Sequence, residues 1–99
     1  MIEISNDYQN NYKQSFAGDT FNFAAYISNK KIKVDFLSAI GTDQFSKDFL
    51  NFSKRKKIST KLIKILPNYE LGLYLIKNKS NGEKEFHYWR DNTAAKFFF

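Results

Sequence analysis

The chain has 99 residues, of which 42% are apolar and 18% aromatic, and it carries a net charge of +6. This composition supports one modest folded core or a piece of a larger one, and it excludes a disordered tail. With no cysteine, the chain has no disulfide framework, zinc-thiolate site or thiol nucleophile. No apolar run approaches the roughly 20 residues that span a bilayer, and acidic residues near the start argue against a signal peptide. We therefore expect a cytoplasmic protein with no membrane partner.

The positive charge raises the question of nucleic acid binding. The basic residues are spread along the chain, and only Lys54-Arg55-Lys56-Lys57 forms a run. This run falls at the end of a predicted helix, where cations complement the helix dipole. Proteins that bind nucleic acid usually concentrate such charge on one face. We expect no nucleic acid partner, and a small basic module that combines this run with the aromatic segment 86–89 is the alternative.

The first half of the chain predicts an alternation of strands and helices. Ile2 and Ile4 alternate with polar residues and indicate the end of a strand that runs into the polar stretch 6–11. Apolar residues at helical spacing predict a helix from Asp19 or Thr20 to about residue 29.

A buried strand and a second helix are predicted next. Residues 33–40 are rich in β-branched and aromatic side chains and stop at Gly41, which is typical of a buried strand. Asp43 is then placed to cap a helix whose apolar residues fall on one side. Helix, strand and helix in this order indicate an α/β layer.

The last third predicts extended structure. A short strand over 62–66 ends at Pro67, and two further strands over 71–78 and 83–90 flank Asn81-Gly82, which is a strong hairpin signal. Three large rings at 97–99 are typical of a chain cut inside a strand. We expect a β-hairpin followed by the start of another strand.

A glycine turn at the first predicted helix is one candidate binding site. It comprises Gly18, Asp19, Thr20, Phe21 and Asn22. The Asp side chain accepts hydrogen bonds and the Asn side chain both donates and accepts them, which suits the hydroxyls of a sugar. The alternative is that Asp19 or Thr20 only caps the helix.

The end of the predicted hairpin is a second candidate site, formed by Tyr88, Trp89 and Arg90 with Tyr74 on the opposite strand. An arginine fork matches a carboxylate, and tyrosine hydroxyls can share the remaining lone pairs of an acid. The site would then take an acidic ligand. The alternative is a cross-strand aromatic cluster with Arg90 stacked at its edge.

Other catalytic signals are weak. His87 is the only histidine and has no predicted partner, so we interpret it as a structural strand residue with no metal site. Neither Glu70 nor Asp91 has a pattern that marks a general base. No phosphate-binding glycine loop followed by Lys and Ser or Thr is present in the sequence.

The order of these segments resembles the ribokinase-like (PfkB-type) carbohydrate kinases along essentially the whole chain. The resemblance lies in Met1–Ser5, Gly18–Asn22, Ala39–Asp43, Gly72–Tyr74 and Phe86–Arg90, with Ala94–Phe97 following. The glycine turn and the Ala-Ile-Gly-Thr-Asp segment are similar to many of these kinases. Tyr88-Trp89-Arg90 is more particular to the branch that acts on the sugar acid 2-keto-3-deoxygluconate.

The resemblance implies a Rossmann-type α/β sandwich with a small β-sheet lid, whose strands fall at about 2–16 and 71–90. It implies transfer of the γ-phosphoryl group of ATP to the terminal hydroxyl of 2-keto-3-deoxygluconate. Gly18–Asn22 would then hold the substrate hydroxyls, while Tyr74, Tyr88 and Arg90 would hold the ketoacid end, with Trp89 beside them. The lid could also mediate formation of a homo-oligomer.

Two departures from the family pattern are small, namely Ala17 at a frequent glycine and His87 at a usual aromatic. The larger one is length, because the family's anion hole and Asp base lie far downstream of residue 99. We therefore expect residues 1–99 to be the N-terminal substrate-binding portion of such a kinase. ATP and Mg²⁺ would serve the complete enzyme and would not be bound by this segment, which has no catalytic residue and is expected to be inactive alone.

Overall fold

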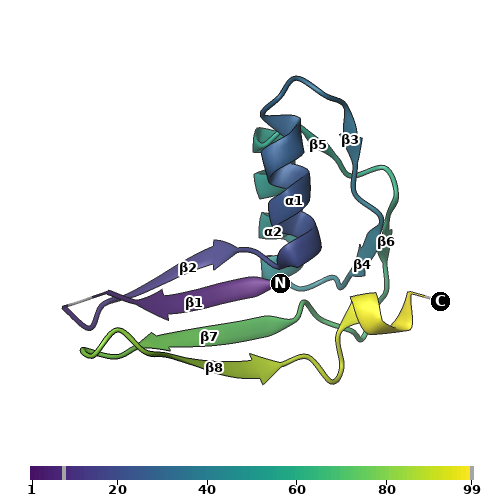
Figure 1. Cartoon of the computed structure of the whole chain (residues 1–99). Coiled ribbons are helices and arrows are strands. Elements are labelled where there is room, and N and C mark those ends of the chain that lie inside the picture. The colour runs from purple at the N-terminus through teal and green to yellow at the C-terminus, as the bar shows by residue number, and fades with distance from the viewer. Residues whose placement is uncertain (8, 99) are drawn as a thin grey trace.

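The computed structural model describes residues 1–7 and 9–98. A four-stranded sheet, called the lid below, extends away from a body made of two adjacent helices and short strands (Figure 1). In chain order the elements are β1 (Ile2–Asn6), β2 (Tyr12–Phe16), α1 (Asp19–Ser28), β3 (Val34–Asp35), β4 (Ser38–Ile40), α2 (Gln44–Arg55), β5 (Ile58–Ser59), β6 (Ile63–Ile65), β7 (Leu73–Asn78), β8 (Lys84–Trp89) and a 3₁₀ helix (Ala94–Phe97).

The lid has the strand order β2-β1-β7-β8. β1 pairs with β2 and β7 with β8 in antiparallel fashion, and the two hairpins join through a parallel pairing of β1 with β7. At the far end of the lid, the side chain of Asn6 bonds the backbone of Asn78, donating to its carbonyl at 3.0 Å and accepting from its N–H. Nδ2 of Asn78 returns a bond of 2.8 Å to the Asn6 carbonyl. These side chains lock the register between the hairpins.

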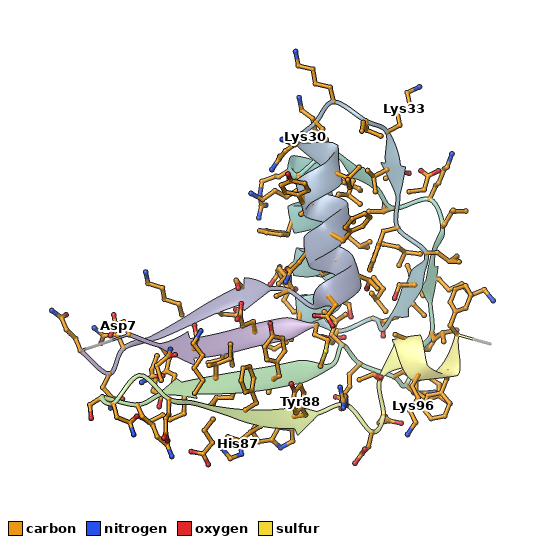
Figure 2. The ribbon with its side chains drawn as sticks, viewed as in Figure 1. Asp7, Lys30, Lys33, His87, Tyr88 and Lys96 are labelled. Atoms are coloured by element: carbon orange, nitrogen blue, oxygen red, sulfur yellow. The ribbon has the colours of Figure 1, made fainter. Side chains whose placement is uncertain are left out.

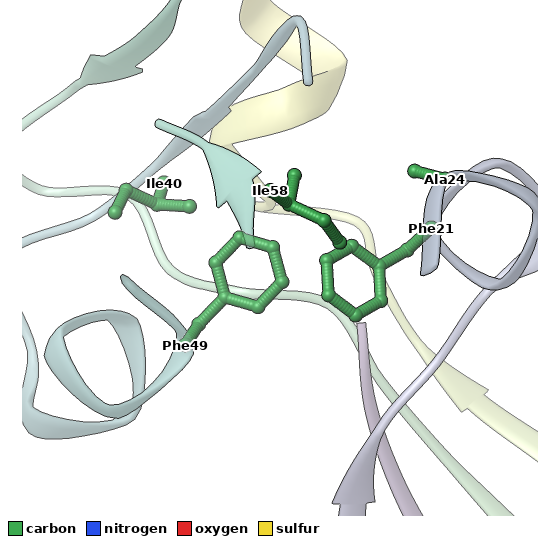
Figure 3. Close-up of a cluster of buried hydrophobic side chains, with 5 residues drawn as sticks. All are labelled: Phe21, Ala24, Ile40, Phe49 and Ile58. Carbon is green, nitrogen blue, oxygen red and sulfur yellow. The ribbon is translucent and has the colours of Figure 1, made fainter. Parts of the chain in front are cut away.

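The core of the body lies between the helices and the short parallel strand pairs β3-β5 and β4-β6. The rings of Phe21 and Phe49 lie 4.9 Å apart between centroids, and both are 2% exposed. Ala24, Ile40 and Ile58 complete this buried cluster (Figure 3). Both helices place their buried residues three or four positions apart, as a helix that packs on one face must do.

The turn from β4 into α2 depends on a close approach and a side-chain cap. A Cβ atom at Gly41 would lie 1.9 Å from the carbonyl oxygen of Tyr69, so only glycine fits. Ser46 donates from Oγ to Oδ1 of Asp43 at 2.7 Å and accepts from the Gly41 N–H at 3.0 Å. The Asp43 cap of α2 predicted from the sequence is confirmed, because its side chain accepts from the Ser46 N–H.

Several predicted boundaries need correction. The strand expected over 33–40 is divided into β3 and β4, because residues 36–37 leave extended pairing between two different partner strands. Strand β5 was not predicted, because two residues carry too little periodicity. The predicted hairpin is confirmed, with strands over 73–78 and 84–89.

The prediction that the rings at 97–99 lie in a strand is wrong for residue 97. Residues 94–97 form a 3₁₀ helix, and Ala94 is fully buried in it. The ring of Phe97 lies 4.7 Å from that of Tyr69, and Nζ of Lys64 lies 4.7 Å from the ring of Phe98. Local aromatic and cationic partners therefore take the place of a strand partner. Phe99 lies outside the described residues.

Candidate functional site

A cavity of about 560 Å³ lies where the body meets the lid. Its walls include the turn before α1, the end of β4 and the segment that follows β8. Five of the nine residues predicted to bind substrate line it, namely Gly18, Asp19, Thr20, Phe21 and Arg90. The structure thus brings together two sequence signals about 70 residues apart.

The glycine turn has a conformation that explains its composition. Gly18 is the N-cap of α1 with φ 122° and ψ 150°, a region that is open only to glycine. The expectation that Asp19 or Thr20 caps the helix is wrong, because α1 begins at Asp19 and no side-chain bond caps it. Among the described residues, no hydrogen bond or ion pair engages the Asp19 carboxylate, so it is free for a ligand hydroxyl.

Arg90 enters the cavity from the lid side. Its guanidinium lies 4.5 Å from the centroid of the Tyr88 ring, a cation–π contact that holds the fork in place. Asp19 and Arg90 therefore contribute opposite charges to one cavity. A ligand that offers hydroxyls at one end and a carboxylate at the other matches this arrangement.

Tyr74 and Tyr88 flank the cavity without lining it. They are register partners on β7 and β8, and their rings stack at 5.9 Å. Burial, followed by the charge of Glu3, raises the pKa of Tyr74 to about 12. The Asp19 carboxylate acts in the same direction, which indicates that the Tyr74 hydroxyl lies within electrostatic reach of the glycine turn.

Two predicted residues are not brought to the cavity. Asn22 is exposed on α1, one helical turn after Gly18, and does not line the cavity. Trp89 is 56% exposed, and because successive strand residues point to opposite faces, it lies on the face away from Tyr88. His87 shares that other face, and Figure 2 shows His87 and Tyr88 on opposite sides of β8.

Sequence reasoning missed several polar residues of the cavity wall. Glu70, Asp91 and Lys96 line it. Glu70 arrives there because its backbone bridges to Thr93, and its carbonyl accepts from the Ala94 N–H at 2.9 Å. A backbone bridge between distant residues leaves no spacing pattern in the sequence, so the place of Glu70 could not be predicted. The place of Asp91 could have been predicted, because this residue directly follows Arg90.

The basic residues are less dispersed than the sequence indicated. A separate groove of about 550 Å³ at the C-terminal ends of α1 and α2 is lined by Lys31, Lys33, Arg55, Lys56 and Lys57. Folding joins the run at 54–57 to a second basic segment after α1. This groove lies at the opposite end of the molecule from Tyr88, as the positions of Lys30, Lys33 and Tyr88 show (Figure 2).

Two observations concern phosphate and metal binding by the described residues. Both α-helices have an acidic residue at the N-terminus, Asp19 in α1 and Asp43 in α2, which disfavours a phosphate group there. Within residues 1–7 and 9–98, no group of three or more His, Cys, Asp or Glu side chains could hold a metal. In the same residues, no helix is long and apolar enough to cross a membrane.

The arrangement of lid, body and cavity defines a ribokinase-like α/β fold, and solved structures agree. A fructokinase from Xylella fastidiosa, solved with bound ATP, superimposes with a TM-score of 0.84 at 18% identity, covering 96% of this chain and 32% of that one. A PfkB protein from Polaromonas sp. JS666 gives 0.85 at 20% identity, over 96% of this chain and 34% of that one. At these identities the likeness concerns the fold.

Residues 3–98 match the family described as pfkB family carbohydrate kinase, and the chain belongs to that family. It is 37% identical over 102 residues to the 2-dehydro-3-deoxygluconokinase of Escherichia coli strain K12, covering 99% of this chain and 33% of that protein. The chain spans about a third of the length of the curated relatives that it matches.

Proposed function

We propose that this chain forms the substrate-binding part of a kinase that transfers the γ-phosphoryl group of ATP to 2-keto-3-deoxygluconate, giving the 6-phosphate. The observation that carries the proposal is that Gly18, Asp19 and Arg90 line the same cavity. The relatives named 2-dehydro-3-deoxygluconokinase support the choice of sugar acid.

In this proposal the chain binds and orients the sugar acid. The Asp19 carboxylate accepts hydrogen bonds from sugar hydroxyls, and the backbone around Gly18 lets the ligand approach closely. Arg90 pairs with the carboxylate of the ligand through its planar fork. Asn22 and Trp89 remain predicted contacts that lie outside this cavity.

ATP, Mg²⁺ and the catalytic base belong, in this proposal, to other parts of the kinase. Phosphoryl transfer depends on positioning and charge stabilisation of the phosphates. The 99-residue chain alone should bind the sugar acid and should show no sugar-dependent ADP release in a coupled assay. Robust turnover would contradict this division of roles.

Replacing Arg90 tests the acid-binding role. Arg90→Ala should weaken binding of 2-keto-3-deoxygluconate roughly 10- to 100-fold in calorimetry, the loss expected for a charged hydrogen-bonding pair. Arg90→Lys keeps the charge without the fork and should fall in between. Lys84→Ala removes an exposed cation from the start of β8, the strand that precedes Arg90, and serves as the matched control outside the cavity. Unchanged affinity in Arg90→Ala would refute the role.

Another sugar, such as fructose or a nucleoside, is the alternative substrate within the family. Neutral sugars that compete with the sugar acid would support it. A binding or regulatory role without catalysis would give saturable ligand binding and no turnover.

The positions of the basic groove and the aromatic strand support the proposal over the nucleic acid alternative. It required the basic run and the aromatic strand to act together, and the two lie at opposite ends of the molecule (Figure 2). Binding of oligonucleotides that falls steeply with salt would nevertheless favour it.

The proposal also includes a cytoplasmic location and a homo-oligomer formed through the lid. Exposed aromatic residues on the lid support the second point, since Tyr12 is 48% and Trp89 56% exposed. Sedimentation of the purified protein across a concentration range measures the oligomeric state.

A further inference from the structure

The turn between β7 and β8 carries a motif to which the proposed function gives no role. Asn81 is the only asparagine in the sequence that a glycine follows. Residues 79–85 are exposed, and the turn lies at the end of the lid farthest from the helices (Figure 1). Two bonds close it, from the Gly82 N–H to the Lys79 carbonyl at 3.0 Å and from the Lys79 N–H to the Glu83 carbonyl at 2.9 Å. Asn81 therefore lies in a short loop that water can reach.

Gly82 leaves its own backbone nitrogen accessible. A Cβ added at this position would meet no atom within 4 Å, and φ is 87°, a conformation that glycine adopts readily. The side chain of Asn81 is long enough to bring its Cγ to the nitrogen of the following residue. No side chain at Gly82 obstructs that approach.

The side-chain carbonyl of Asn81 is polarised by a hydrogen bond. Its Oδ1 accepts from the Glu83 N–H at 3.0 Å. When a nitrogen attacks Cγ, negative charge develops on this oxygen, and a backbone N–H aimed at it stabilises the charge as in an oxyanion hole. A polar groove of about 870 Å³ opens beside Asn81 and gives water access to the same carbon.

One hydrogen bond opposes a reaction at this site. The Gly82 nitrogen must lose its proton before it can attack, and in the closed turn its N–H donates to the Lys79 carbonyl. Exposed turns with few apolar contacts open locally at little cost. Local opening of the turn, without unfolding of the lid, is enough to release this nitrogen.

We propose that Asn81 is a site of spontaneous deamidation in the folded protein. The Gly82 nitrogen gives its proton to water or hydroxide and forms a bond to Cγ of Asn81. The side-chain nitrogen takes up a proton and leaves as ammonia, which produces a cyclic imide. Water then opens one of the two C–N bonds of the imide and leaves aspartate or isoaspartate at position 81. The net change is the gain of one water and the loss of one ammonia, with no oxidation or reduction.

The two products differ in their effect on the turn. In isoaspartate the main chain runs through the former side chain and gains one methylene group. The bonds donated by the Gly82 and Lys79 N–H groups close the loop around this point, so both should be lost. Aspartate keeps the ordinary main chain, and its carboxylate can still accept from the Glu83 N–H. This inference does not depend on which sugar the protein binds.

Incubation of the purified folded protein in mildly alkaline buffer tests the reaction. Relative to a sample that is not incubated, the tryptic peptide 80–84 should progressively gain the mass difference between OH and NH₂. Protein-isoaspartate methyltransferase should label the same peptide, while peptides with the other asparagines stay unchanged. Asn81→Gln keeps the amide on a longer side chain and should abolish the signal. A folded protein that stays unmodified while the isolated peptide 80–84 reacts would overturn the proposal.

Amide hydrogen exchange tests the consequence for the turn. In the deamidated protein, isolated by cation-exchange chromatography, exchange at the Lys79 and Gly82 amides should be faster in the isoaspartyl population. Asn81→Asp is the matched control, because it adds the same charge on an ordinary main chain and should keep the protection of both amides. Equal exchange in the isoaspartyl form and in Asn81→Asp would overturn the predicted loss of the turn bonds.

Discussion

The body encloses a cluster of buried apolar side chains, whereas the lid leaves several of its rings in solvent. Phe21 and Phe49 are 2% exposed between the helices and short strands, while every residue of β8 is exposed. The lid is held by continuous backbone pairing across four strands and by the reciprocal Asn6–Asn78 bonds. Apolar burial stabilises the first region and hydrogen bonding the second.

This difference explains where a ligand site can form. A packed core fixes its side chains against one another, and its contribution to the cavity is apolar wall from Phe21, Ile40 and Phe49. The lid presents Tyr74 and Tyr88 from a paired backbone, and Arg90 follows directly after β8 in contact with the Tyr88 ring. The cavity lies where such a surface meets the glycine turn of the body.

The largest effect is expected from truncating a core ring. Phe49→Ala should lower the free energy of unfolding by about 3–5 kcal/mol, because it leaves a cavity beside Phe21 and Ile40. Phe86→Ala in the lid, where the ring is 48% exposed, should cost less than about 1.5 kcal/mol. Urea unfolding of the purified variants measures both.

Phe45→Ala is the matched control within the body, since this ring lies on the same helix as Phe49 and is 48% exposed. It should behave like the lid variant. Equal losses for Phe49 and Phe86 would break the distinction between the two regions.

A smaller effect is expected from the lock between the lid hairpins. Asn6→Ala removes the partners of both backbone groups of Asn78 and should cost roughly 1–3 kcal/mol, the penalty for unsatisfied polar groups. Amide hydrogen exchange should speed up in β1 and β7 and stay slow in the body. Gln14→Ala, an exposed change on β2, is the control, and uniform acceleration across the body would contradict a local role.

The smallest effect is expected from pH. Burial, assisted by Glu3, raises the pKa of Tyr74 to about 12 from its ordinary value of 10, so the folded state retains the proton where the unfolded state loses it. This contribution is complete below pH 10 and disappears as pH rises through 12. Tyr74→Phe should flatten the decline in the free energy of unfolding between these pH values. An unchanged profile would show that stability does not depend on ionisation of this hydroxyl.

The elements with long or strongly marked patterns were predictable from the sequence. The Asn81-Gly82 hairpin and the Asp43 cap were expected from local chemistry and are confirmed. The division of 33–40 was not predictable, because it depends on which distant strands supply partners. The 3₁₀ helix at 94–97 likewise depends on burial of Ala94 against β4, a contact between distant segments.

The candidate site could be predicted only in part. Gly18 and Arg90 were found because glycine before a helix and arginine after aromatics carry chemical meaning by themselves. Glu70 was missed because its place in the cavity follows from a backbone bridge to Thr93.

The contact at Gly41 has a consequence for how freely the sequence can vary. The Tyr69 carbonyl occupies the space that any side chain at this position would need, and that carbonyl begins the segment leading into the lid. A saturation library screened for folded protein should therefore return glycine alone at position 41. Gly82 has no atom within 4 Å of an added Cβ, so this position should accept asparagine. The set of residues accepted at each of these two positions would then show that close backbone contact restricts position 41 and that position 82 is free of such contact.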